Sequence, residues 1–481
     1  MAFLAGKIPI RMVGQSPSDL IFFSVLNDQF LRLKVSITAR LRNQWVKKAK
    51  KQHLFLRIVS CETNYRRKQV LLKTILNNRY KCKSFVYKNA TFEGENLIIE
   101  IRPRVNSQAI CSSCKSPAPC YDTSPQPRRF EFIPILGFKV FFSYTMRRVS
   151  CACGVKVEQV PWAEGKTEVS TPFMLFLASW AKGLSWQEIA DRFKVTWNKV
   201  FRSVKHVVEW GLASRDLNGI RAIGVDEISW RKGYSFLTLV YQLDGACRRL
   251  LWVAEDRTVR PILGFFRWLG KERSSLIKYV CSDMWKPYLK VIARKAGEAI
   301  HVLDRFHIAK WMNKAVDEVR INEQKNLSRE GYETLKHSRW CLLKHKENLT
   351  DKQSIKLKEL LHKRLKSVKA YLMKEEFHKF WKFISVGWAS KFLDSWTRMA
   401  IRSRIKPMKR VARILLSYRS LILNWFKAKE EIKSAAVEGL NNKAKVTTKK
   451  AYGFRTFKCI QIALFHALGG LPQPELTHRL W

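Results

Sequence analysis

Two aspartates at the ends of predicted strands are the residues best placed to do chemistry in this sequence. Asp226 ends the strand-like run 222–225, and Asp283 follows the strand-like run 277–281. Carboxylates are ligands that Mg²⁺ or Mn²⁺ prefers, and two such ions about 4 Å apart can activate a water or sugar hydroxyl and stabilise the leaving oxygen of a phosphodiester. Each aspartate alone also fits a strand-end turn or a helix cap, so the prediction depends on the pair.

A two-ion site needs a third carboxylate, for which Glu438 is the candidate. It lies beside two asparagines and ahead of a basic stretch that could hold a DNA backbone. Glu430 and Glu431 compete for this role, but their Lys/Glu-rich surroundings favour ordinary salt bridges. The cations near Glu438 that we expect to contact DNA are Lys443, Lys445 and Arg455.

Four cysteines indicate a second kind of chemistry. Cys111 and Cys114 form a C-x-x-C pair, and Cys151 and Cys153 form a C-x-C pair after a stretch of short predicted strands. Two such pairs predict a structural, tetrahedral zinc site. The C-x-C spacing is tighter than usual, so Cys120 is an alternative ligand and a metal-free module stays open. No histidine or carboxylate lies at the spacing that a catalytic zinc would need.

The elements that must position the two aspartates follow a definite order. Asp244-Gly245 predicts a type I′ hairpin between the second and third strands. The order β-β-β-α-β-α-β is that of the RNase H-like fold, in which the first and fourth strands are neighbours and Asp226 and Asp283 would converge. The expected strands are 222–225, 234–243, 248–254, 277–281 and 300–303, with helices at 258–269 and 285–296.

Residues 172–210 predict a helix-turn-helix. Ser185 and Glu188 form a capping box that opens a helix ending at Phe193, and Thr196 can cap a second helix. A plain helical hairpin is the alternative interpretation. If the second helix enters a DNA groove, its outward polar side chains suit base edges and phosphates. These side chains are Asn198, Lys199, Arg202 and Lys205.

Composition limits the class of protein. The 481 residues include 90 Lys and Arg and 39 Asp and Glu, a net charge of +51, which an ordinary metabolic enzyme has no reason to carry. A hydrophobic content of 46% excludes a disordered basic tail. A polyanion, nucleic acid before a membrane surface, is therefore the expected partner. No apolar run reaches the roughly 18 residues of a membrane span, and eleven scattered cysteines favour a reducing cytoplasm.

We therefore expect a multidomain α+β protein. A basic helical pattern follows the fifth strand and interrupts the core as a large α-helical insertion. The expected parts are an N-terminal extension of poor order (1–69), a zinc-binding β-rich module (70–165), the helix-turn-helix domain (166–215), the first part of the RNase H-like core (216–310), the α-helical insertion (311–428) and the C-terminal part of the core (429–481).

Several long segments resemble the ISL-three (ISL3) family of insertion-sequence transposases, which are DDE enzymes. The resemblance covers about 70–481, although the first 66 residues lie upstream of the family's usual start and the second cysteine pair is one residue short. The matching segments are Gly224–Ile228, Cys281–Tyr288, His301–His307, Val437–Lys443, Ala451–Arg455 and Leu471–Trp481.

The resemblance implies that Asp226, Asp283 and Glu438 form the metal-binding DDE triad. It also implies that Asp304 and His307 form a D-x-x-H signature, with His307 near the active site; a purely structural histidine is the alternative. The implied protein is a bacterial, cytoplasmic, nucleoid-associated enzyme. It would bind terminal inverted repeats in double-stranded DNA, cleave there, and join 3′-hydroxyl ends to target DNA, with a homodimer pairing two ends.

Two other functions compete with this one. The first is a DNA-binding regulator made of a zinc module and a helix-turn-helix, with an inactive nuclease core. The presence of all three candidate acids argues against decay of the core. The second is an RNase H-like nuclease that processes RNA, against which the predicted reader of double-stranded DNA argues.

Overall fold

A computed structural model describes residues 72–82, 84–231, 233, 235–428, 435–451 and 453–474. The predicted N-terminal extension (1–69) and the competing acids Glu430 and Glu431 lie outside these ranges. Every helix in the described ranges is too short or too polar to cross a membrane.

A five-stranded mixed sheet forms the centre of the predicted core. Its order is β12-β11-β10-β13-β14: the first three strands pair antiparallel, and β10, β13 and β14 pair parallel. β10 therefore has β13 as its neighbour, as the strand pattern predicted. The strands are β10 (Ala222–Ser229), β11 (Phe236–Gln242), β12 (Arg249–Glu255), β13 (Tyr279–Ser282) and β14 (Ile300–Leu303).

The register of this sheet brings three aspartates to one edge. Val225 of β10 is paired with Ser282 of β13, and Ser282 is paired with Leu303 of β14. The next residue of each chain segment is an aspartate, namely Asp226, Asp283 and Asp304. We call this the acid edge of the sheet.

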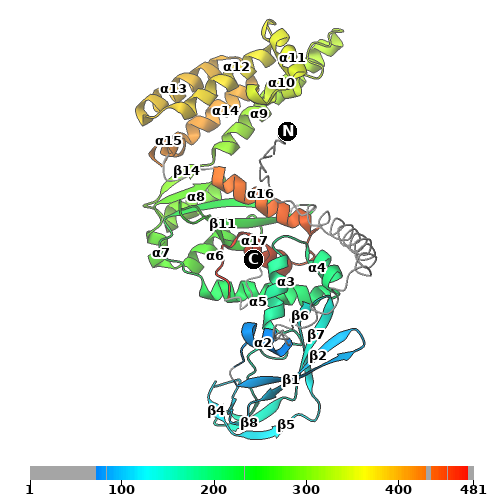
Figure 1. The fold of residues 1–481 in the computed structure, drawn as a ribbon. Helices are drawn as coiled ribbons and strands as arrows, with labels where there is room; N and C mark the ends of the chain where they lie inside the picture. The colour runs from blue at the N-terminus through cyan, green and yellow to red at the C-terminus, as the bar shows by residue number, and fades with distance from the viewer. Residues whose placement is uncertain are drawn as a thin grey trace, which may run out of the picture. The chain divides into compact units, whose positions relative to one another are not determined.

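Side chains alternate along a strand, so both faces of the sheet carry apolar side chains. Helices cover each face. Val240 of β11 packs with α6 (Val259–Leu269) and α8 (Lys286–Lys295), whereas its neighbours Leu239 and Tyr241 belong to the larger cluster on the other side. There α16 (Ala435–Lys450) contacts β10, and α17 (Phe457–Leu468) contacts β12 (Figure 1). The short α7 is Lys271–Ser275.

The predicted type I′ hairpin is wrong. Gln242 pairs with Arg249, so residues 243–248 form a longer loop, and Gly245 lacks the positive φ that a type I′ turn requires. The Asp244 carboxylate instead accepts from the backbone N–H of Arg221 at 3.3 Å and from Nε2 of Gln242 at 2.8 Å. These contacts hold the loop against the end of the sheet away from the acid edge.

A series of helices follows β14, and we refer to it as the insertion. Its first helix begins earlier than the expected boundary of 311, because Asp304 caps it directly at the end of the strand. The insertion returns to the sheet through α15, which contacts β14, where the Asn424 side chain donates to the His301 carbonyl at 3.0 Å. The helices are α9 (Arg305–Arg329), α10 (Arg339–Leu343), α11 (Asp351–Leu361), α12 (Lys366–His378), α13 (Val386–Arg402), α14 (Lys406–Ser417) and α15 (Arg419–Lys427) (Figure 1).

The N-terminal part of the described chain is rich in β-structure. After α2 (Leu72–Arg79), a four-stranded sheet has the order β1-β2-β7-β6 and an aromatic core around Phe130, Phe142 and Trp162. Short strands beside it carry the cysteines. The strands are β1 (Phe85–Glu93), β2 (Asn96–Pro103), β3 (Ala109–Ile110), β4 (Pro117–Ala118), β5 (Cys120–Thr123), β6 (Arg128–Ile135), β7 (Phe138–Tyr144), β8 (Arg147–Cys151) and β9 (Gly154–Val157).

Three helices follow this region. The capping box of Ser185 and Glu188 is present at the start of α4, and the Thr196 hydroxyl accepts from the backbone N–H of Lys199 at 3.3 Å at the start of α5. Lys194 turns the chain between them with a φ of 53°. α5 is longer than predicted because apolar side chains along it pack against α3 and α17. The helices are α3 (Thr171–Trp180), α4 (Trp186–Phe193) and α5 (Trp197–Ser214).

Candidate active site and cysteine cluster

The acid edge concentrates negative charge in a largely buried place. Only 8% of Asp283 and 6% of Asp304 is exposed. Burial raises the pKa of Asp226, and the charges of Asp304 and Asp283 raise it further, against the lowering by the Glu227 backbone N–H and by His307. Carboxylates that repel each other in this way form a site that a cation would stabilise.

A buried asparagine orients Asp226. The Asn441 side-chain amide donates to Oδ2 of Asp226, and the Tyr241 hydroxyl donates to Oδ1 of Asn441 at 2.8 Å. The backbone N–H of Glu227 donates to Oδ1 of Asp226 at 2.8 Å. Sequence reasoning noted Asn441 only as a neighbour of Glu438; its position one helical turn later was the available signal.

Glu438 is exposed in the first turn of α16. It lies three residues before Asn441, and residues at this spacing share one side of a helix. The helix can approach β10 closely because residue 224 is glycine: a Cβ there would lie 2.8 Å from Cγ2 of Val437 and 2.9 Å from Cδ1 of Leu243. The helix turn that carries Glu438 is thereby packed on the strand that carries Asp226.

Asp283 is held from two sides. The backbone N–H of Trp285 donates to Oδ1 at 3.0 Å, and the Arg257 guanidinium lies 3.4 Å from Oδ2. Arg257 also pairs with Oε2 of Glu227 at 2.7 Å. Burial and the charge of Asp283 raise the pKa of Glu227 to about 7. Glu227 and Arg257 were both missed from the sequence, although Glu227 directly follows Asp226.

Asp304 and His307 lie together at the start of α9. Oδ1 of Asp304 accepts from the backbone N–H of Phe306 at 3.0 Å, so this aspartate caps the helix. Its Oδ2 lies 3.3 Å from Nδ1 of His307, an ion-pair distance rather than an aligned hydrogen bond. The contact with Asp304 raises the pKa of His307, and the charges of Asp226 and Asp283 act in the same direction.

The four predicted zinc ligands are brought together. The Sγ atoms of Cys111, Cys114, Cys151 and Cys153 all lie within 4.8 Å of one another. Tetrahedral zinc with Zn–S bonds of about 2.3 Å separates its sulfurs by about 3.8 Å, so the cluster is compatible with zinc. Cys120 lies outside the cluster, and its thiol donates to the Asp122 carbonyl at 3.4 Å.

A tight hairpin explains how the C-x-C spacing works. Cys151 pairs with Gly154 across the β8–β9 turn, and Gly154 has a φ of 82°, which allows the sharp reversal. The Ser116 backbone N–H lowers the pKa of Cys114 to about 6, while hydrogen bonding to Cys114 and Cys151 raises the pKa of Cys153 to about 12. A cation bound by the four sulfurs would favour their ionised forms.

The predicted DNA-contacting side chains have different surroundings. Asn198 and Arg202 are exposed on α5, and Lys205 lies 3.8 Å from Glu209. Lys199 forms an ion pair at 2.6 Å with Glu131 of β6, which is buried. Three further predicted cations near the C-terminal end of the core are exposed: Lys443, Lys445 and Arg455.

Several known proteins are similar to this chain over most of its length. The model of the ISL3-type DDE family, described as "Transposase", matches residues 223–464, half of the chain. The transposase for insertion sequence element IS1001 of Bordetella parapertussis is 27% identical over 75% of this chain and 89% of its own length. The transposase for IS1557 of Mycobacterium tuberculosis is 26% identical over 79% of this chain and 90% of its own length. The chain therefore belongs to the ISL3 family of DDE transposases.

Proposed function

We propose that this transposase cleaves phosphodiester bonds at the inverted-repeat ends of an insertion sequence and joins the freed 3′-hydroxyls to target DNA. The observation that carries the proposal is the acid edge, where three aspartates follow paired positions of neighbouring strands, and where α16, whose first turn carries the exposed Glu438, packs on the strand that carries Asp226. The strand order supports an RNase H-like core. We propose Asp226, Asp283 and Glu438 as the catalytic acids.

The donor set fits Mg²⁺ or Mn²⁺, because it consists of carboxylate oxygens. Burial, and after it the charges of Asp304 and Asp283, raises the pKa of Asp226, an effect that a bound cation would oppose. Two bound metal ions would activate the attacking hydroxyl and stabilise the leaving oxygen. The protein's own part is to orient the ligands: Asn441 fixes Asp226, and the Trp285 backbone N–H fixes Asp283. We place His307 as an accessory group beside Asp304, positioned to hold a proton near the acids.

DNA recognition is assigned to the N-terminal elements. We propose that the four cysteines hold a structural zinc ion and that α4 and α5 form a helix-turn-helix, with Asn198, Arg202 and Lys205 facing the DNA. Lys199 ties α5 to β6 through Glu131, so its first role is to orient the helix. Because transposition must pair two ends, we propose a homodimer in the DNA complex, acting on nucleoid DNA in the bacterial cytoplasm.

The test is Mg²⁺-dependent cleavage of duplexes that carry the inverted repeats flanking the coding region. Asp226→Asn should abolish cleavage and leave end binding nearly intact, because it removes a metal ligand without disturbing the DNA-reading elements. The matched control is Asp244→Asn, which changes a strand-end aspartate away from the acid edge and should keep full cleavage. Loss of end binding in a folded Asp226→Asn protein would contradict the assignment.

The competing functions give different results in the same assay. A regulator with an inactive core would bind the ends and cleave nothing with Mg²⁺ or Mn²⁺. If the protein is an RNA-processing nuclease, RNA hybrids added as competitors should efficiently inhibit its cleavage of the DNA duplex.

A further inference from the structure

A groove of about 700 Å³ lies between α4 and the segment that joins α16 to α17. We call it the aromatic groove. One part of its lining is formed by large rings and another by cationic side chains. The residues used below are Lys182, Trp186, Trp197, Lys450, Phe454 and His466.

The aromatic part leaves one large ring open to solvent. Trp186 is buried and makes edge contacts with Trp197 and Phe454, at centroid distances of 5.5 and 5.6 Å. Trp197 stacks on Phe201 at 5.5 Å with an interplanar angle of 11°, yet 36% of it stays exposed. Packing therefore fixes the orientation of Trp197 while part of it remains available, which is how proteins present a ring to an unpaired base.

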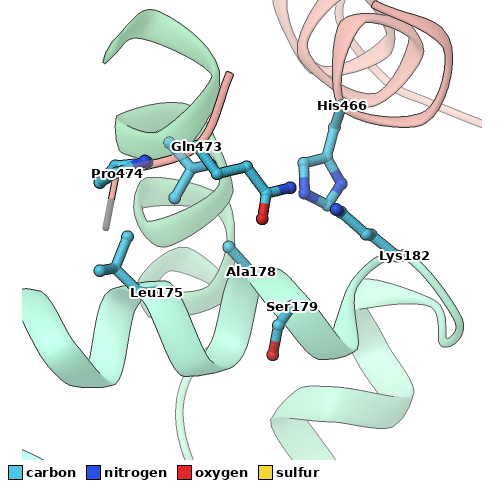
Figure 2. Close-up of a pocket in the computed structure, with 8 residues that line it drawn as sticks. Leu175, Ala178, Ser179, Lys182, His466, Gln473 and Pro474 are labelled. Atoms are coloured by element: carbon cyan, nitrogen blue, oxygen red, sulfur yellow. The ribbon is translucent and has the colours of Figure 1, made fainter. Parts of the chain in front are cut away.

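The cationic part contains a histidine nitrogen with nothing to bond to. Nε2 of His466 is buried and has no hydrogen-bond partner among the described residues. Burial, together with the charges of Lys182 and Lys450, lowers the pKa of His466 to about 4. Figure 2 shows His466 beside Lys182 and Gln473 in a small adjoining pocket. Two ammonium groups around an unbonded imidazole suit an anion.

The two acids that line the groove already have partners. Glu188 accepts from the backbone N–H of Ser185 at 2.7 Å in the capping box, and Asp191 accepts from the Gln187 side chain at 2.9 Å. Glu188 still acts on the cationic part, because its charge raises the pKa of Lys450 against the lowering by burial. Lys450 also donates to the Lys182 carbonyl at 3.4 Å, which keeps the two lysines together. Rings in one part and ammonium groups in another match a nucleotide, with its flat base and its phosphate.

We propose that the aromatic groove holds one unpaired nucleotide of the bound DNA, its base against Trp197 and its phosphate near Lys182 and Lys450. The occupant is part of a DNA strand because the groove is next to the N-terminus of α5, the helix assigned to DNA contact. α16 also runs from Glu438 to Lys450, about 18 Å, a span of about five nucleotides along one strand. The inference rests on the proposed transposase function and adds strand unpairing near the cleaved end.

The test compares end duplexes that are identical except for one bulged 2-aminopurine nucleotide about five positions from the cleavage site. The full-length protein should bind the bulged duplex about tenfold more tightly than the paired one and change the 2-aminopurine fluorescence. Trp197→Ala should remove this preference and leave paired-duplex binding unchanged. Trp210→Ala is the matched control, since Trp210 is 40% exposed on the same helix but does not line the groove.

A second variant guards against misfolding of the first: Phe454→Ala, on another part of the groove wall, should also lose the preference for the bulge. Equal binding of bulged and paired duplexes by the native protein overturns the proposal, as does an equal loss of both in Trp197→Ala. Displacement of the bulged duplex by free deoxyadenosine monophosphate at similar affinity also overturns it. If the protein cleaves paired ends but shows no preference for the bulge, the groove proposal fails and the proposed transposase function is unaffected. If it prefers the bulge but cleaves neither duplex, the proposed transposase function fails and the groove proposal is unaffected.

Discussion

Glu227, the residue after Asp226, is a carboxyl group whose charge changes near neutral pH. Its pKa of about 7 lies above the ordinary value of 4.5, so folding favours its protonated form. The stability that this group contributes is fully present below pH about 4.5 and is lost as the pH rises through about 7. At alkaline pH the charge of Glu227 therefore lowers the free energy of unfolding of the native protein, and glutamine would not carry that charge.

We expect Glu227→Gln to be more stable, relative to the native protein, at pH about 8 than at pH about 5. The comparison uses urea unfolding midpoints of both proteins at the two pH values, in the absence of divalent ions. Because every other titrating group is common to the pair, their difference isolates Glu227. A difference that does not change with pH would show that the residue titrates normally.

Some residues of the site were predictable and others were not. Asp226 and Asp283 were found because each ends an apolar run, which is a local pattern. The hydrogen bond from Asn441 to Asp226 joins residues 215 positions apart, and no local pattern encodes such a distance. Lys199 was predicted to face outward from the second helix, but the helical period cannot show that a buried Glu131 lies opposite it.

At the scale of elements, the close approach of α16 to β10 depends on Gly224. We expect Gly224→Ala to displace the helix turn that carries Glu438, because the new Cβ would lie less than 3 Å from side-chain atoms of Val437 and Leu243. End cleavage should fall at least tenfold while end binding stays close to native. Cleavage rates and binding affinities of purified variants measure this.

Gly439→Ala is the matched control for that change. Nothing lies within 4 Å of a Cβ at this helical position, and alanine favours a helix over glycine by up to about 1 kcal/mol. The variant should keep its cleavage activity and have a slightly higher Tm. Full activity in Gly224→Ala would show that the spacing between strand and helix does not position Glu438.

The cysteine module should depend on its metal, because its own apolar cluster is small, with four buried residues: Ala109, Cys111, Ala118 and Val149. We expect one zinc ion per chain in the native protein, and loss of end binding when a chelator removes it. Cys114→Ser should lower the zinc content and weaken end binding. Cys120→Ser, an exposed cysteine outside the cluster, should do neither.

Metal analysis together with end-binding titrations checks the three proteins. A native-like zinc content in Cys114→Ser, or a lower one in Cys120→Ser, would mean that the ligand set is wrong.

Element types were easier to predict than their connections. The strands and helices of the core follow from apolar runs and periodicity, and their order placed β10 beside β13. The Asp244-Gly245 dipeptide was misleading because Asp244 bonds to Arg221 and Gln242, so tertiary contacts override the local turn preference. The tight C-x-C spacing is accommodated by the β8–β9 hairpin and the left-handed Gly154, neither of which the cysteine spacing encodes.

At the scale of the whole molecule, the net charge of +51 should dominate the affinity for DNA. If the complex neutralises about ten phosphates, a plot of log affinity against log salt concentration should have a slope of roughly −9. Fluorescence anisotropy of labelled duplexes over a series of salt concentrations gives this slope. A slope shallower than about −3 would mean that most of the cationic surface stays away from DNA.

The continuous helix α9 connects the acid edge rigidly to the helical insertion. It starts at the Asp304 cap, which is part of the acid edge, and extends for 25 residues, about 37 Å, into the helical insertion. A tilt of about 10° about the cap would move its far end by about 6 Å, while Asp304 and His307 shift only slightly. A large displacement of the insertion therefore corresponds to a small displacement beside the carboxylates. DNA that pulls on the insertion would change the alignment of the reacting groups only slightly.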